Sequence, residues 1–204
     1  LEFRRVLFRS LTTAQNAVLK AAILADPALD AYPNSIDGNL DMASQKLNKT
    51  AAPDFLVWNS RTPTSSVFDS IDWSKYTPTA AMDDASIADS LAAERRQTQM
   101  LAIQTKQMNL QNMLVGRDTI DATKTNIRSG LRDAVIALPA GTAGANVAAG
   151  GASGATTLAA CSRKANLIEK ILTAGPVTTG ATTFDLPGYE GTVTGADVAT
   201  ARNS

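Results

Sequence analysis

Two pairs of carboxylates are the residues in this sequence whose spacing comes nearest to a catalytic arrangement. Asp83 and Asp84 are adjacent, and Asp69 and Asp72 flank the dipeptide Ser-Ile. Two carboxylates held close together can act as general acid and general base, because the charge of one raises the pKa of the other. Neighbouring acids are also typical of helix starts, where they cap the first turn and interact with the helix dipole. We interpret both pairs as caps and keep a carboxylate enzyme as an alternative.

The sequence contains no histidine and a single cysteine, Cys161. The absence of histidine removes the commonest general base and the commonest transition-metal ligand, so the familiar nucleophile–base triads fail at once. One cysteine can form neither an intrachain disulfide nor a multi-cysteine zinc site. Cys161 lies in an apolar stretch that we expect to be helical, which favours a small buried packing residue over a nucleophile.

A third acidic group, Asp118 and Asp121 beside Arg117, follows the pattern of loop and cap residues. No calcium loop of the type D-x-D-x-D-G accompanies it. The sequence therefore predicts no catalytic residue, no cofactor-binding residue and no metal ligand.

Residues 139–154 form an uncharged segment that is rich in glycine and alanine. A phosphate cradle would need a G-x-G-x-x-G motif, or spaced glycines followed by Lys-Ser/Thr, between a strand and a helix. Neither pattern is present, and a helix is expected before the segment. We predict a flexible loop that orders against a partner subunit.

Four aromatic residues, Trp58, Phe68, Trp73 and Tyr76, are close together in the sequence. They could form a platform on which nucleic-acid bases stack. No run of Arg or Lys interleaves them, so we predict an aromatic mini-core that holds the N-terminal part of the chain together.

Arg128 and Arg132 lie four residues apart and share a face of an expected helix. This face could contact an acidic partner. We interpret it as a solvated helix face.

The elements that must position these residues are mostly helices, so the predicted fold is mainly α: a helical bundle with a small β-hairpin near the C-terminus. Phe55–Trp58 is left open as a strand or an extended segment. Residues 184–186 are expected to pair with residues 191–194 around Pro187-Gly188. The expected helices are 11–25 with a cap at Thr12 or Thr13, a short turn after Pro27 carrying Leu29 and Tyr32, a helix after Asp37, and residues 63–70, 83–115, 123–138, 155–174 and 195–202.

The longest expected helix, 83–115, combines an apolar stripe with a strongly polar face. Leu101, Met108 and Leu114 are expected on the stripe, and Ile103 and Leu110 widen it. Polar-faced helices of this length often pack across subunits or against a neighbouring domain.

The first ten residues, 1–10, match the translation of a common sequencing adapter, so we expect them to be an artefact that packs on nothing. The native chain would then be a single mainly helical domain over residues 11–204, from a metagenomic gene fragment. Without the artefact's three Arg and one Glu, 16 basic and 18 acidic residues remain (19 − 3 and 19 − 1). A weakly acidic chain is a poor general nucleic-acid binder, and no apolar run approaches the roughly 20 residues of a spanning helix.

Several segments, taken in order, resemble a group of small proteins of tailed bacteriophages and prophages that belong to the structural gene block. The resemblance covers nearly all of residues 11–204 and suggests proteins of the head–tail adaptor type. The segments that carry it include residues 11–23, Asp26-Pro27, Asp37-Gly38, Val57-Trp58, 106–117, 126–133, 140–144, 189–193 and Asp197-Val198.

The resemblance implies a non-enzymatic virion protein, a head–tail connector or adaptor subunit that assembles as a homo-oligomeric ring and binds phage portal or tail proteins. It implies localisation in the virion, and in the host cytoplasm during assembly, with no membrane partner and no sequence-specific nucleic acid. The helix over 83–115 and the loop over 139–154 would serve such an assembly. The alternative is a phage regulatory or host-interaction protein that binds a bacterial partner.

Overall fold

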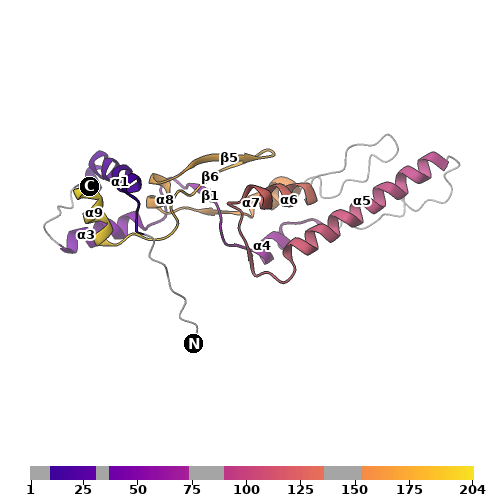
Figure 1. Ribbon diagram of the computed structural model, residues 1–204, viewed down its shortest axis with the longest axis horizontal. Coiled ribbons are helices and arrows are strands. Elements are labelled where there is room, and N and C mark those ends of the chain that lie inside the picture. The colour runs from indigo at the N-terminus through magenta and orange to yellow at the C-terminus, as the bar shows by residue number, and fades with distance from the viewer. Residues whose placement is uncertain (1–9, 31–36, 74–89, 136–152) are drawn as a thin grey trace, which may run out of the picture. The chain divides into compact units, whose positions relative to one another are not determined.

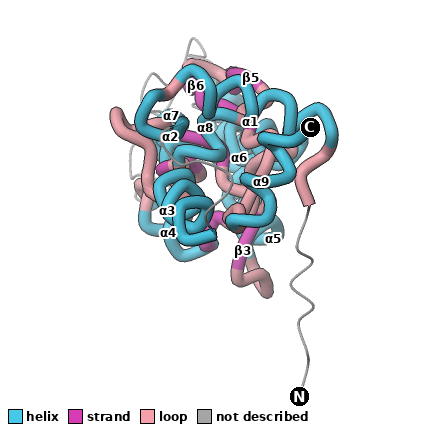
Figure 2. Tube along the Cα trace, turned by 90° about the vertical axis from the view of Figure 1, so that its left-hand side faces the viewer, coloured by secondary structure: helices cyan, strands magenta, loops and turns pink. Residues whose placement is uncertain are grey.

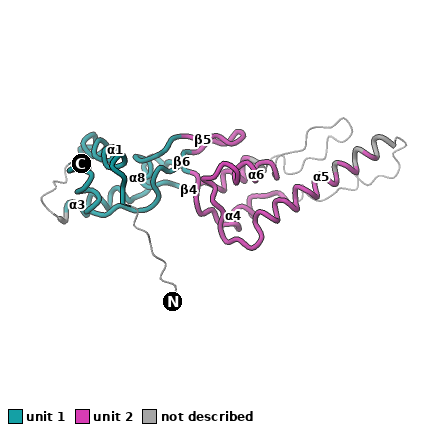
Figure 3. Tube along the Cα trace, viewed as in Figure 1, with its two compact units in different colours: residues 1–57, 164–175, 185–204 teal, residues 58–163, 176–184 magenta. Residues whose placement is uncertain are grey.

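The computed structural model of the chain describes residues 10–30, 37–73, 90–135 and 153–204. These residues belong to two compact units, which Figure 3 draws in different colours. Unit 1 comprises Leu1–Val57, Lys164–Gly175 and Asp185–Ser204, and unit 2 comprises Trp58–Arg163 and Pro176–Phe184. The predicted single domain over residues 11–204 stays a prediction, since compactness does not show whether two units unfold together.

Several predicted features lie outside the described residues. They are residues 1–9 of the expected adapter artefact, Tyr32, Tyr76, the pair Asp83 and Asp84, and residues 139–152 of the Gly/Ala-rich loop. Ser10, the last residue attributed to the adapter, is described and exposed. Ser153 and Gly154 belong to helix α7 (Ser153–Ala159), so the loop ends earlier than predicted.

Unit 1 draws its helices from both ends of the chain (Figure 1). One apolar core joins them, in which Leu19, Leu47 and Val198 are fully buried. Leu40 and Ala43, on the helix predicted after Asp37, are buried in the same core. The helices are α1 (Thr13–Ala25), α2 (Pro27–Asp30), α3 (Asp37–Leu47), α8 (Leu167–Ile171) and α9 (Gly195–Asn203).

Three helices of unit 1 begin with complete capping boxes. In each box the cap side chain accepts a hydrogen bond from a backbone N–H in the first turn, and an acceptor three residues later takes one from the cap's own N–H. The cap predicted at Thr12 or Thr13 is at Thr12. The pairs are Thr12 with Gln15 at α1, Asn166 with Glu169 at α8, and Thr194 with Asp197 at α9.

Unit 2 contains the longest described helix, α5 (Ser90–Leu114), which packs against α6 (Thr125–Val135). Helix α6 also packs against α7, and both α5 and α6 present buried leucines, among them Leu110 and Leu131. The short helix α4 (Thr64–Asp69) confirms the helix predicted over residues 63–70, with Val67 buried. Strands β2 (Thr62–Pro63) and β3 (Thr119–Ile120) form a two-stranded antiparallel sheet.

The predicted fold class is wrong, because a four-stranded sheet accompanies the helices and makes the protein a mixture of α and β (Figure 2). Its order is β4-β1-β6-β5, and β1 pairs parallel with β6 through Val57 and Asp185. The open choice at residues 55–58 is settled as a strand. The strands are β1 (Leu56–Trp58), β4 (Ser162–Lys164), β5 (Gly175–Thr179) and β6 (Thr182–Leu186).

The predicted hairpin around Pro187-Gly188 is also wrong. Strand β6 follows β5 through a turn at Gly180, whose φ of 62° lies in the left-handed region that favours glycine. In the segment after Gly188, the backbone groups of Val193 form hydrogen bonds with a side chain and not with a strand. Asn48 donates to the Val193 carbonyl at 2.8 Å and accepts from the Val193 amide at 2.9 Å. One asparagine thereby satisfies the backbone groups that a strand partner would have taken.

The predicted helix over residues 155–174 is divided into α7, β4 and α8. Backbone groups in its middle bond to the segment around residue 55: the Ala165 amide donates to the Phe55 carbonyl at 2.8 Å, and the Ala51 amide donates to the Ala165 carbonyl at 3.0 Å. Asn166 then starts α8 with its capping box. Helical spacing of apolar residues could not reveal this interruption, because partners far away in the sequence impose it. In the described parts of the chain, the helices include none with the length and hydropathy needed to cross a membrane.

Candidate functional site

Of the acidic residues considered above, the structure describes Asp69, Asp72, Asp118 and Asp121. Asp69 and Asp72 are both exposed. The carboxylate of Asp121 accepts hydrogen bonds from the amide and the hydroxyl of Thr123 at 3.0 and 2.6 Å, which fits its predicted cap role. Across the described ranges, no group of three or more acidic or cysteine side chains is placed to hold a metal ion.

Cys161 is fully buried, in the turn between α7 and β4 and not inside a helix as predicted. Burial raises the pKa of its thiol to about 11, and a hydrogen bond with Thr62 opposes the rise. The thiolate is the nucleophilic form of cysteine, so a thiol with this pKa is unreactive near neutral pH. The prediction of a buried packing residue is confirmed.

Arg128 is the principal error of the sequence interpretation, because its guanidinium lies in the core of unit 2 and not on a solvated face. Nη1 donates to the carbonyls of Ala122 and Thr123 at 2.7 and 2.6 Å. Nε and Nη2 donate to the hydroxyls of Thr179 and Thr125 at 3.1 and 3.2 Å. Desolvation lowers the pKa of Arg128, and the charge of Asp121 opposes this. These bonds engage the guanidinium with its own unit, so it is not available to an acidic partner.

Trp58 completes the buried cluster around Arg128. The guanidinium carbon lies 5.0 Å from the Trp58 ring centroid, within range of a cation–π contact. The Phe184 ring lies edge-on to the same indole, with 5.0 Å between the ring centroids. Trp58 Nε1 donates to the Val177 carbonyl at 3.2 Å. The indole is therefore closed to a stacking base, as the mini-core interpretation requires.

The predicted mini-core nevertheless has different members. Phe68 and Trp73 stack on each other at 5.0 Å, while the ring partner of Trp58 is Phe184, far along the sequence. The partners of Trp58 come from the strands and α6, which sequence proximity could not indicate.

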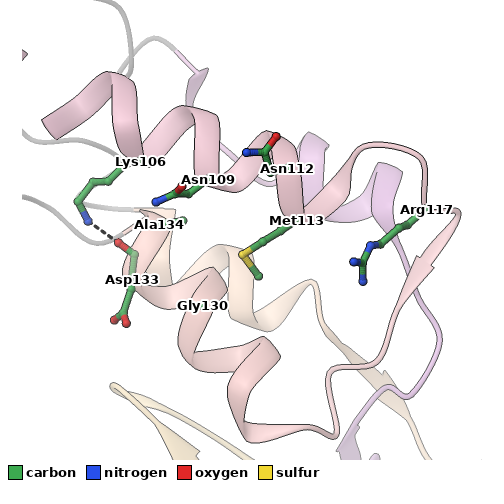
Figure 4. A pocket seen from close by; sticks show the side chains of 8 residues that line it. All are labelled: Lys106, Asn109, Asn112, Met113, Arg117, Gly130, Asp133 and Ala134. Carbon is green, nitrogen blue, oxygen red and sulfur yellow. Dashed lines mark hydrogen bonds between the residues drawn. The ribbon is translucent and has the colours of Figure 1, made fainter. Parts of the chain in front are cut away.

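A groove of about 630 Å³ lies between α5 and α6 (Figure 4). Lys106 donates to the main-chain carbonyl of Asp133 across it. Burial lowers the pKa of Lys106, and the charge of Asp133 opposes this. The helices approach closely at Gly130, where a Cβ would lie 3.0 Å from Met113 Cε and the flexible end of Met113 would have to shift slightly. The lining residues are Lys106, Asn109, Asn112, Met113, Arg117, Gly130, Asp133 and Ala134.

A neighbouring face of α5 carries an exposed apolar stripe. Leu101, Met108 and Val115, the residue that follows the helix, are 64%, 57% and 67% exposed. We call these three residues the α5 stripe. They stand seven positions apart, so they lie along one face of the helix.

The α5 stripe corrects the single wide stripe expected for residues 83–115. Ile103, Leu110 and Leu114 are buried, while Leu101 and Met108 point to solvent. The sequence did contain the signal. Leu101 and Ile103 are two residues apart, which places them about 200° apart around a helix, and each starts its own seven-residue series. Two narrow stripes on opposite sides describe this helix better than one wide stripe.

Comparison with known proteins does not identify the chain: no protein-family model, no curated protein and no solved structure matches it. The candidate site therefore rests on the geometry of α5 itself. In the described part of unit 2, its exposed stripe is the feature best suited to contact another macromolecule.

Proposed function

We propose that the protein is a non-enzymatic structural component of a tailed-phage virion, a head–tail connector or adaptor subunit. It acts by self-assembly and by binding to portal or tail proteins. It resides in the virion, and in the host cytoplasm during assembly. The ordered set of sequence segments that resembles the structural-block proteins supports this proposal.

The single observation that carries the proposal is the α5 stripe. Exposed apolar side chains scattered singly are normal on a soluble protein, whereas contiguous apolar patches mark interaction sites. Leu101, Met108 and Val115 are aligned over about 21 Å of helix, at 1.5 Å per residue. A subunit that acts by association needs such a surface.

The chemistry of the described residues supports association over catalysis. Asp69 and Asp72 are both exposed. Cys161 is buried with a raised pKa, and Arg128 is committed to hydrogen bonds inside unit 2. None of these side chains is poised to act on a substrate.

Mass spectrometry of purified virions, from a phage or induced prophage that carries this gene, tests the proposal. We expect the protein in the virion at a fixed ratio to the portal protein. Light scattering should also show a larger species when purified chain and portal are mixed. Absence from virions, together with a monomer alone and with portal, would refute the proposal. Capture of a bacterial protein by the chain under those conditions would favour the regulatory alternative.

A further inference from the structure

We draw no further inference here: the strongest candidate, the groove between α5 and α6, carries none, because Lys106 in it already bonds to the Asp133 carbonyl and no described residue shows what would bind beside it.

Discussion

Unit 1 and unit 2 are both built largely from helices, but they differ in which side chains they bury and which they leave exposed. Unit 1 buries its aliphatic side chains in one core and fixes three helix starts with capping boxes. Unit 2 buries a charged arginine and leaves an aligned apolar stripe exposed. The exposed Val18 and Leu24 of unit 1 are six positions apart on α1, so they lie on different faces of that helix. The core and the capping boxes of unit 1 stabilise its fold. The α5 stripe of unit 2 is a surface suited to association.

Among the substitutions that test this comparison, replacing Arg128 should cause the largest loss of stability. Arg128→Ala should destabilise the protein by about 4 kcal/mol, since it removes the donor from the buried carbonyl of Ala122 and the half-buried carbonyl of Thr123 and opens a cavity beside Trp58. Denaturant unfolding followed by tryptophan fluorescence measures the loss. Arg128→Lys is the control that keeps the charge but cannot reproduce the fork of donors, so it should recover only part of the stability. Full recovery with lysine would show that charge alone matters.

Leu19→Ala removes buried apolar atoms from the core of unit 1. It should lower the free energy of unfolding by about 3 kcal/mol, the usual loss for a buried leucine. It also tests the predicted single domain, because the two tryptophans, Trp58 and Trp73, both belong to unit 2. If the units unfold as one domain, the fluorescence midpoint shifts together with the far-ultraviolet circular dichroism. A fluorescence transition that stays in place while the circular dichroism shifts would show two independent units.

The buried thiol of Cys161 predicts a loss of stability in alkali. Its pKa in the folded protein, about 11, lies above the ordinary value of 9.0, so folding favours the neutral thiol. The stabilisation that the neutral thiol gives the folded state is fully present below about pH 9 and is lost as pH rises to 11. It amounts to about 2–3 kcal/mol. Unfolding free energies of wild type and Cys161→Ala, compared at pH 8 and pH 11, measure it. A difference between the two proteins that does not change with pH would contradict the prediction.

The smallest expected effect on stability is the loss of a cap in unit 1. Thr194→Ala removes the hydroxyl that accepts from the Asp197 amide at 3.3 Å, and it should cost about 1 kcal/mol. Thr194→Ser keeps the acceptor and serves as the control. Thermal denaturation monitored by circular dichroism measures both, and equal losses for the two variants would show that the cap contributes nothing.

The sequence predicted local features better than distant ones. The cap at Thr12, the helix after Asp37 and the burial of Cys161 follow from neighbouring residues, and the structure confirms them. The four-stranded sheet could not be predicted in this way, because β1 and β6 are joined by pairing between Val57 and Asp185, far apart in the chain. Long-range pairing overrides local helical spacing, as it does in residues 155–174.

The candidate site was partly visible in the sequence. The polar face of the long helix suggested contact with another subunit, but the apolar positions of α5 were assigned to one stripe instead of two. Arg128 was assigned to solvent because charged residues are almost never fully buried unless they are paired. Its partners are carbonyls, hydroxyls and an indole from three separate segments, and the spacing of Arg128 and Arg132 could not reveal them.

The central claim is that unit 2 associates through the α5 stripe, and the most direct test is a charge placed at Met108. Multi-angle light scattering over a range of concentrations compares the wild type with Met108→Lys and with Met42→Lys, a matched control because Met42 on α3 is 51% exposed, against 57% for Met108. We predict that the average mass of the wild type and of Met42→Lys rises with concentration, while Met108→Lys stays at the mass of the monomer. A Met108→Lys variant that associates as strongly as the wild type would contradict the claim.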